Sequence, residues 1–186
     1  MAGKYGSRNE QGDHRVLDDD PRAIAVLKEE HHVFRTLFDE AEEAEGAELK
    51  RIADEICLRL GVHMAIEEEI LYPALKPVIG RDEVDEGIVE HASGKRLAME
   101  IEQLTGTEEL YKSKVHVLGE ETVHHIDEED EDLFADAKAA HAAGKLDLDE
   151  IGERLRARQA ELYRRIEETG EMGETDEADA EEIERV

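Results

Sequence analysis

The chain has 186 residues and carries 51 acidic against 23 basic side chains, for a formal net charge of −28. Such an acidic surface disfavours nucleic acid and anionic membranes as partners, and the length suits a single domain. No stretch approaches the ~20 consecutive apolar residues that a membrane span requires. A lone cysteine, Cys57, cannot form an intramolecular disulfide, so we expect a buried thiol and a cytoplasmic protein.

Residues 1–19 are polar and rich in glycine, and we expect them to form a flexible N-terminal arm. A first helix is predicted to start at Asp20 and Pro21, because aspartate can cap a helix and proline suits its first turn. Its apolar positions alternate at spacings of three and four, which is typical of one helix face. This face consists of Ile24, Leu27, His31, Phe34, Phe38 and Ala41.

Gly46 marks a turn, and a second helix is predicted to follow and to end at Pro73 and Pro77, before Gly80. Its inward face consists of Leu49, Ile52, Ile56, His63, Glu67 and Ile70. A carboxylate on such a face is costly unless it is paired or binds a metal, so Glu67 is unusual. The adjacent pair, Glu68 and Glu69, is interpreted as surface charge.

A third helix is predicted from about Asp82, with His91 on an apolar face, and it breaks near Gly106. The fourth helix is predicted to run over residues 108–143 and to stop at Gly144. Its inward face consists of Leu118, His125, Glu129 and Leu133. The other histidines of this helix fall off that face; they are His116, His124 and His141.

Asp147 or Asp149 can cap a fifth helix, whose apolar stripe consists of Ile151, Leu155, Leu162 and Ile166. Gln159 interrupts the stripe, so we expect this helix to pack less tightly than the first four. Residues 169–186 are acidic and poor in apolar side chains, which is typical of a disordered tail. The expected organisation is therefore an arm over residues 1–19, a helical domain over 20–168 and a tail over 169–186.

One pattern occurs twice and organises the whole chain. His63 and Glu67 lie four residues apart, which places both side chains on one face of a helix, and His125 and Glu129 repeat that spacing. A glutamate–histidine pair precedes each copy, ending in His31 and His91 respectively. The sequence therefore indicates two helical hairpins, each with a lone histidine on its first helix and His-x3-Glu on its second.

Short turns make consecutive helices antiparallel neighbours, so the four helices should form an all-α, up-down-up-down bundle. Counting residues from each turn places the inward polar side chains at similar heights. Nitrogen and oxygen donors without thiolate suit iron, manganese or zinc. The candidate metal ligands are His31, His63, Glu67, His91, His125 and Glu129. The simpler alternative is a metal-free bundle in which histidines and glutamates are hydrogen-bonded to each other.

These stretches together resemble the hemerythrin-like, HHE cation-binding family, and the similarity covers most of residues 21–138. The resemblance implies a four-helix bundle, here with an additional C-terminal helix, around two iron ions with an oxo or hydroxo bridge. The four histidines would be the imidazole ligands, and Glu67 and Glu129 would be the bridging carboxylates.

The chain departs from oxygen-carrying hemerythrins, which have a second histidine four residues after the one on the third helix. Here that position is Lys95. Those carriers also have an aspartate five residues after the last histidine, whereas here Glu129 comes four residues after His125. We therefore expect binding of, or reaction with, dioxygen, peroxide or nitric oxide, in sensing or detoxification, rather than reversible oxygen carriage. A weak peroxidase, catalase-like or oxidase activity and an iron buffer remain open. Glu68, Lys95 or Tyr72 could complete the metal shell.

A ferritin-like carboxylate centre is the second architecture that the sequence allows. Its Glu-x-x-His spacing is matched by Glu29 with His32 and by Glu121 with His124. Both histidines lie off the apolar faces, however, and this alternative leaves the repeated set unexplained.

Overall fold

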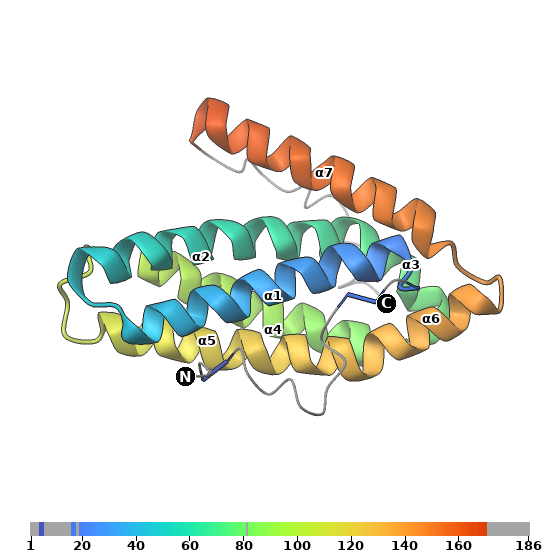
Figure 1. Cartoon of the computed structure of the whole chain (residues 1–186), viewed down its shortest axis with the longest axis horizontal. Helices are drawn as coiled ribbons and strands as arrows, with labels where there is room; N and C mark the ends of the chain where they lie inside the picture. The colour runs from blue at the N-terminus through green and yellow to red at the C-terminus, as the bar shows by residue number, and fades with distance from the viewer. Residues whose placement is uncertain (1–3, 6–15, 18, 81, 171–186) are drawn as a thin grey trace, which may run out of the picture.

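The computed structural model describes residues 4–5, 16–17, 19–80 and 82–170. Over these residues every regular element is helical (Figure 1). The elements are α1 (Arg22–Glu43), α2 (Gly46–Ile66), η1 (Glu67–Leu71), α3 (Tyr72–Ile79), α4 (Asp82–Glu102), α5 (Tyr111–Glu128), η2 (Glu129–Leu133), α6 (Phe134–Ala142) and α7 (Leu148–Thr169). None of these helices is long and apolar enough to cross a membrane.

Four helices form a bundle in which α1 and α4 each pack against both α2 and α5 or their continuations. The fifth long helix, α7, lies on the outside against α1 and α2 (Figure 1). The expected all-α class is confirmed, and these contacts fit a bundle with an additional C-terminal helix.

The apolar core is divided into two clusters along the bundle. One cluster includes Leu27 and Val84, and the other includes Phe34 and Ala98. The polar inward residues lie between them in sequence, since His31 falls between Leu27 and Phe34 on α1. A buried polar layer is therefore enclosed by apolar side chains above and below, which keeps bulk water away from it.

The second helix does not end at Pro73, contrary to the prediction. One π-helical turn, η1, follows α2 and the chain continues as α3, which contains Pro73 and Pro77. In this turn the backbone N–H of Tyr72 donates to the carbonyl of Glu67, five residues back. Pro73 lies in the first turn of α3, where the wider turn has shifted the hydrogen-bond register, whereas Pro77 lies inside α3.

The second repeat contains the same turn, η2, in which the N–H of Phe134 donates to the carbonyl of Glu129. Ala135 takes the place of Pro73 there, so proline is not what causes the turn. Both π turns begin at a buried glutamate of the repeated motif. π turns inside longer helices frequently occur at functional sites.

Two predicted helix starts were wrong in detail. Asp20 does not cap α1; its buried carboxylate instead forms ion pairs with Lys28 and Lys138. The helix after Gly106 starts at Tyr111 rather than at residue 108. Glu108 uses its carboxylate to accept hydrogen bonds from backbone N–H groups of the preceding loop.

The cap of α7 was predicted correctly, because the carboxylate of Asp147 accepts the N–H groups of the next turn. The expectation that α7 packs less tightly than the other helices was wrong. A Cβ added to Gly152 would lie 2.5 Å from the backbone nitrogen of Ala23, so α7 and α1 are in close contact near this point. Gln159 is also engaged, since its amide donates to the carboxylate of Glu30.

Part of the expected N-terminal arm docks on the bundle. Tyr5 is buried against Phe38, and its N–H donates to the carboxylate of Asp39 at 2.6 Å. Most of the arm, and residues 171–186 of the expected tail, lie outside the described residues.

Candidate metal centre

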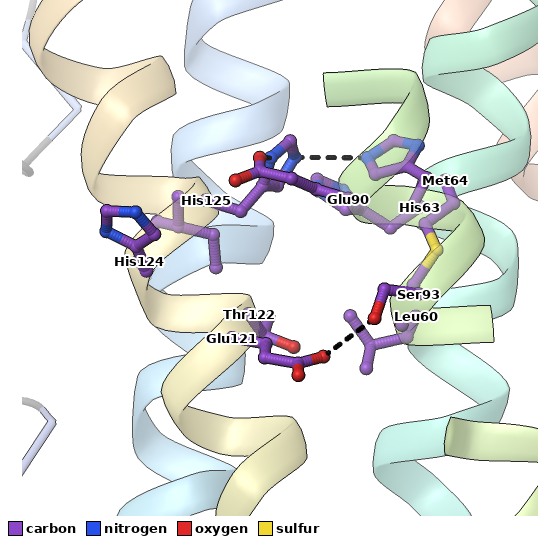
Figure 2. Close-up of a pocket in the computed structure, with 12 residues that line it drawn as sticks. Leu60, His63, Met64, Glu90, Ser93, Glu121, Thr122, His124 and His125 are labelled. Carbon is purple, nitrogen blue, oxygen red and sulfur yellow. Dashed lines mark hydrogen bonds and ion pairs between the residues drawn. The ribbon is translucent and has the colours of Figure 1, made fainter. Parts of the chain in front are cut away.

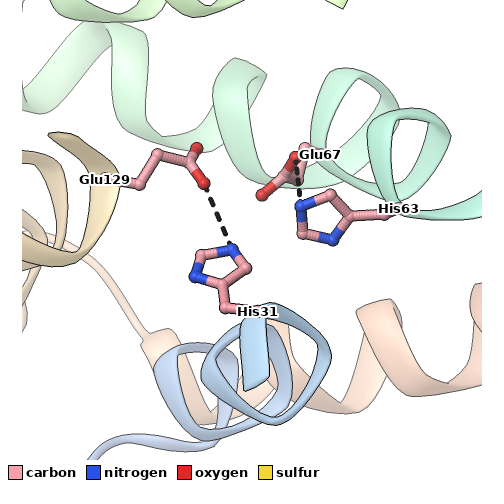
Figure 3. Close-up of side chains that lie close together, drawn as sticks. All are labelled: His31, His63, Glu67 and Glu129. Atoms are coloured by element: carbon pink, nitrogen blue, oxygen red, sulfur yellow. Dashed lines mark ion pairs between the residues drawn. The ribbon is translucent and has the colours of Figure 1, made fainter. Parts of the chain in front are cut away.

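The six predicted side chains lie together in the middle of the bundle, and each of these residues is at most 7% exposed. They form two overlapping groups, in which one donor atom from each member lies within 4.8 Å of the others. The first group, shown in Figure 3, consists of His31, His63, Glu67 and Glu129. The second consists of Glu67, His91 and His125. Glu67 belongs to both, which is the position that a bridging carboxylate requires.

Each of the two glutamates, Glu67 and Glu129, faces one histidine from each of the two groups. The Oε2 atom of Glu67 lies 3.3 Å from Nε2 of His63 and 3.4 Å from Nε2 of His91. The Oε2 atom of Glu129 lies 3.4 Å from Nε2 of His31 and 3.7 Å from Nε2 of His125. Both carboxylates are therefore placed between the two groups, and all four Nε2 atoms point inward.

The other ring nitrogen of each histidine is held by a second acidic side chain. The Nδ1 atoms of His31, His63, His91 and His125 lie 3.0, 3.1, 3.0 and 2.7 Å from a carboxylate oxygen, respectively. The corresponding acids are Asp130, Glu30, Glu68 and Glu90. An N–H on Nδ1 that donates outward leaves the lone pair of Nε2 facing the centre, as metal-binding histidines require.

The role of these four acids as partners of the Nδ1 atoms was not predicted, although the sequence contained a signal for it. Each is the immediate neighbour of a candidate ligand and serves a histidine on another helix: Glu30 adjoins His31 but holds His63. The preferred interpretation of Glu68 as surface charge was wrong, whereas the alternative that it approaches the site agrees with the structure. Its carboxylate binds His91 on one side and the amine of Lys95 on the other.

The centre contains buried polar atoms without a hydrogen-bond partner. They are Nε2 of His31 and of His63, both carboxylate oxygens of Glu67, and Oε2 of Glu129. Buried polar groups are almost always hydrogen-bonded, because desolvation without compensation is costly. A metal-free site of hydrogen-bonded His–Glu pairs would not leave these atoms unpaired. Imidazole nitrogens and carboxylate oxygens in this arrangement fit cations such as iron, manganese or zinc.

Glu68, Lys95 and Tyr72 were the residues that could complete the metal shell. Of these, Tyr72 is the one whose polar atom enters the centre. Its hydroxyl donates to Oε1 of Glu129 at 3.0 Å and lies 3.3 Å from Nε2 of His91. Gly87 provides the space, since a Cβ there would lie 2.8 Å from this hydroxyl. Burial and the nearby glutamates raise the pKa of Tyr72 well above its usual value, so its proton stays on the oxygen.

The two sides of the centre, one around His31 and the other around His91, differ at the position that Tyr72 occupies in the first repeat. Phe134 occupies the position of Tyr72 in the second repeat, and its ring stacks on His31 with a centroid distance of 5.7 Å and an angle of 9°. The half around His31 therefore has an aromatic wall, and the half around His91 has a hydroxyl donor.

The metal-free centre holds opposite charges close together. Burial by itself lowers the pKa of His31, but the nearby carboxylates of Asp130 and Glu129 raise it to about 10. Burial likewise lowers the pKa of His91, whereas Glu67 and Glu68 raise it to about 9. Cation binding must therefore displace protons from the imidazoles.

A cavity of about 160 Å³ opens beside the centre between α2, α4 and α5. His63, His91 and His125 line its inner end, and Gly94 leaves space in its wall. Figure 2 shows this open space, with His124, His125 and Glu90 on one side and Ser93 and Glu121 on the other. The cavity gives a small molecule access to both donor groups.

The histidines of the ferritin-like alternative do not reach the centre. The side chain of His124 is 68% exposed, and its nearest carboxylate partner is Glu128. Glu29, the partner expected for His32, instead forms an exposed ion pair with Arg156. The geometry therefore favours the repeated His-x3-Glu set.

The comparisons with known proteins agree with this geometry. A family model for the hemerythrin HHE cation-binding domain matches residues 22–137. A protein of Nostoc sp. (strain PCC 7120) named DNA nickase is 26% identical over 136 residues, which are 73% of this chain but only 38% of that protein. Uncharacterized proteins of Mycobacterium tuberculosis and Mycobacterium bovis are 27% identical over 149 residues, covering 75% of this chain and 86% of theirs. No solved structure matches the chain significantly. Since the matched region contains all six inward residues and more than half of the chain, the protein belongs to the hemerythrin HHE cation-binding domain family.

Proposed function

We propose that the protein is a non-haem di-iron protein that binds or reacts with dioxygen, peroxide or nitric oxide. The observation that carries this proposal is the convergence of buried donors, several without a hydrogen-bond partner, in two groups that share the carboxylate of Glu67. Under this proposal His31 and His63 serve one ion, His91 and His125 serve the other, and Glu67 and Glu129 bridge them. The short connections between helices support an up-down-up-down order around the centre.

Two iron ions in this centre would supply open coordination positions and electron exchange with a small oxidant. The protein's own side chains would orient the ligands and contact the bound molecule. The acids on the Nδ1 atoms fix the orientation of the four imidazoles. The hydroxyl of Tyr72, which is hydrogen-bonded to Glu129, lies where it can donate a hydrogen bond to a molecule bound near His91. The apolar side chains of Leu60 and Ile126 limit the entry of water.

The cavity restricts what can react. A volume of about 160 Å³ holds a few water-sized molecules, which suits a diatomic gas or peroxide and excludes a drug-sized organic substrate. The side chain of Lys95 is 39% exposed and its amine pairs with Glu68, so this position supplies no additional imidazole. This arrangement supports reaction with an oxidant over reversible oxygen carriage.

We further propose that nucleic acid and membranes are not partners, and that the protein is cytoplasmic. The net charge of −28 supports the first statement, because phosphate backbones and anionic lipids would be repelled, and the lone Cys57 supports the second. The name of the Nostoc relative concerns a protein of which this chain spans only 38%.

The test is rapid mixing of the anaerobic, ferrous protein with dioxygen, hydrogen peroxide or nitric oxide, followed by absorbance. We expect prompt oxidation by dioxygen and peroxide, and loss of the response in His91→Ala. His141→Ala, which changes a histidine outside both donor groups, should behave like the parent. A long-lived, reversible dioxygen complex in the parent would make the protein a carrier. No response to any of the three molecules would refute the proposal.

A further inference from the structure

A third group of potential metal ligands lies on the surface beside the centre. It consists of Glu90 on α4 and of His124 and Glu128 on α5, whose donor atoms lie within 4.8 Å of one another. His124 Nε2 and Glu128 Oε1 are 3.4 Å apart, one helical turn from each other, and both side chains are largely exposed. We call this group the surface triad. Its two carboxylates and one imidazole are donors that suit a divalent cation.

The triad is connected directly to the buried centre. Glu90 belongs to the triad, and its Oε2 atom also lies 2.7 Å from Nδ1 of His125. The other three acids that hold a histidine each have an additional side-chain partner, whereas no second hydrogen bond or ion pair to the Glu90 carboxylate occurs within the described parts of the chain. Those additional partners are Gln159 for Glu30, Lys95 for Glu68 and Arg35 for Asp130. Glu90 thus retains an oxygen for a cation.

A second cavity, of about 110 Å³, leads from this surface toward the centre. Glu90 and Glu128 of the triad line it, and further acidic side chains around it are Glu83, Glu86 and Asp132. The inner wall consists of Tyr72, His125 and Glu129. Glu129 is only 4% exposed, and its Oε2 atom has no hydrogen-bond partner. An acidic opening that ends at a buried carboxylate oxygen without a hydrogen-bond partner points to a cation rather than to an anion or an apolar ligand.

The 160 Å³ cavity approaches the triad from its other side. Glu90 and His124 line that cavity together with His63, whose Nε2 atom is also unpaired. The triad therefore lies where both cavities meet the surface. A cation held there would be bound by Glu90, and the buried donors of the centre would be the ligands that it could reach next.

We propose that the surface triad captures a divalent cation and passes it to the buried centre. The identity of the cation as ferrous iron rests on the proposed function. Acidic clefts with low-dielectric walls concentrate cations and raise their rates of association by about 10- to 1,000-fold. Because the triad is exposed and has only three ligands, it exchanges its cation readily, whereas the centre retains it.

The test compares two double variants of the full chain. His124→Ala/Glu128→Gln removes two triad ligands, neither of which belongs to the buried donor groups. His116→Ala/Glu120→Gln makes the same changes in another histidine–glutamate pair one turn apart, at 3.5 Å. This second pair does not line either of the two cavities at the triad. Both variants lose the same formal charge, so long-range electrostatics are matched.

Metal-free protein is mixed anaerobically with ferrous ion, and uptake is stopped at set times with a ferrous chelator. We expect His124→Ala/Glu128→Gln to load about tenfold more slowly than the parent, with the same final iron content. The control variant should load within about twofold of the parent rate, because His116 and Glu120 do not line either cavity and so lie outside the proposed entry path. A separate titration follows Mn²⁺ by electron paramagnetic resonance in iron-loaded protein, where the triad should bind one additional ion and its variant none.

An unchanged loading rate in the triad variant overturns the delivery role, whatever the manganese result. Retention of the additional manganese site in that variant overturns the assignment of the triad as its ligands. Failure of the proposed function is a distinct result, because a parent protein that takes up no iron at the centre can be titrated with Mn²⁺ without iron loading and can still show the manganese site. In that case loss of the site in the triad variant alone supports cation capture.

Discussion

Replacing Gly87 by alanine tests whether the Tyr72 hydroxyl occupies the centre. A Cβ on Gly87 would lie 2.8 Å from this hydroxyl and 3.2 Å from the ring carbon that carries it. The ring is 2% exposed and cannot swing away without breaking its hydrogen bond to Glu129. Overpacking of this kind costs about 1–3 kcal/mol, while alanine gains about 1 kcal/mol of helix propensity over glycine. The net expectation is a loss of roughly 0–2 kcal/mol.

Gly94→Ala is the matched control on the same helix. Its Cβ would meet only the terminal methyl of Met64, at 3.3 Å, which can move aside. Both variants gain the same propensity, so their difference in unfolding free energy isolates the overlap with Tyr72. We expect Gly87→Ala to be less stable than Gly94→Ala by about 1–3 kcal/mol in urea titrations of metal-free protein. Equal stability would refute the placement of the hydroxyl.

A double-mutant cycle strengthens the test. Tyr72→Phe removes the oxygen that lies closest to the added Cβ, so Gly87→Ala should cost less in that background than in the parent. Neighbouring residues in contact typically couple by about 0.5–3 kcal/mol. Strict additivity of the two substitutions would show that the side chains do not meet.

Three further predictions concern the centre itself. His63→Ala should sharply lower the iron content of purified protein, whereas His116→Ala should not, because only the first belongs to a buried donor group; equal iron contents would contradict the assignment. Asp130→Asn should weaken metal affinity about 10- to 100-fold in chelator competition by loosening the imidazole that it holds, and an unchanged affinity would show that Asp130 is dispensable. The pKa values of His31 and His91 are raised from 6.5 to about 10 and about 9, so their charged forms stabilise the metal-free fold below pH 6.5. That contribution is lost as pH rises through 9 to 10, and thermal melts of metal-free protein should show a falling midpoint; a rising midpoint would contradict this sign.

The inward residues could be predicted because helical phase fixes which side chains share a face. His31 and Glu67 each occupy a position that is otherwise apolar, and the duplication of His-x3-Glu related the two hairpins. The structure brings all six predicted side chains together. Phase alone, however, assigns Glu30 and Asp130 to the flank of a helix. Which histidine on a neighbouring helix they reach depends on how the helices pack, and that is a tertiary property.

The π turns were also beyond the reach of sequence patterns. Proline normally removes a hydrogen bond and clashes with the preceding turn, which is why Pro73 was expected to end the helix. The wider turn at Glu67–Leu71 changes the register, so that Pro73 falls at the start of a new α-helical segment. Nothing in the local residue types indicates such a turn, and Ala135 accompanies it equally well in the second repeat.

Quantification of iron in the anaerobically reconstituted protein, together with its optical spectrum after oxidation, tests the central claim most directly. Two overlapping donor groups that share Glu67 predict two iron ions per chain, with near-ultraviolet absorption bands from iron ions bridged by oxygen. The bands should disappear in Glu67→Ala, because this carboxylate belongs to both groups. A parent protein that binds one ion or none, or that keeps both ions and the same spectrum without Glu67, would contradict the proposed di-iron centre.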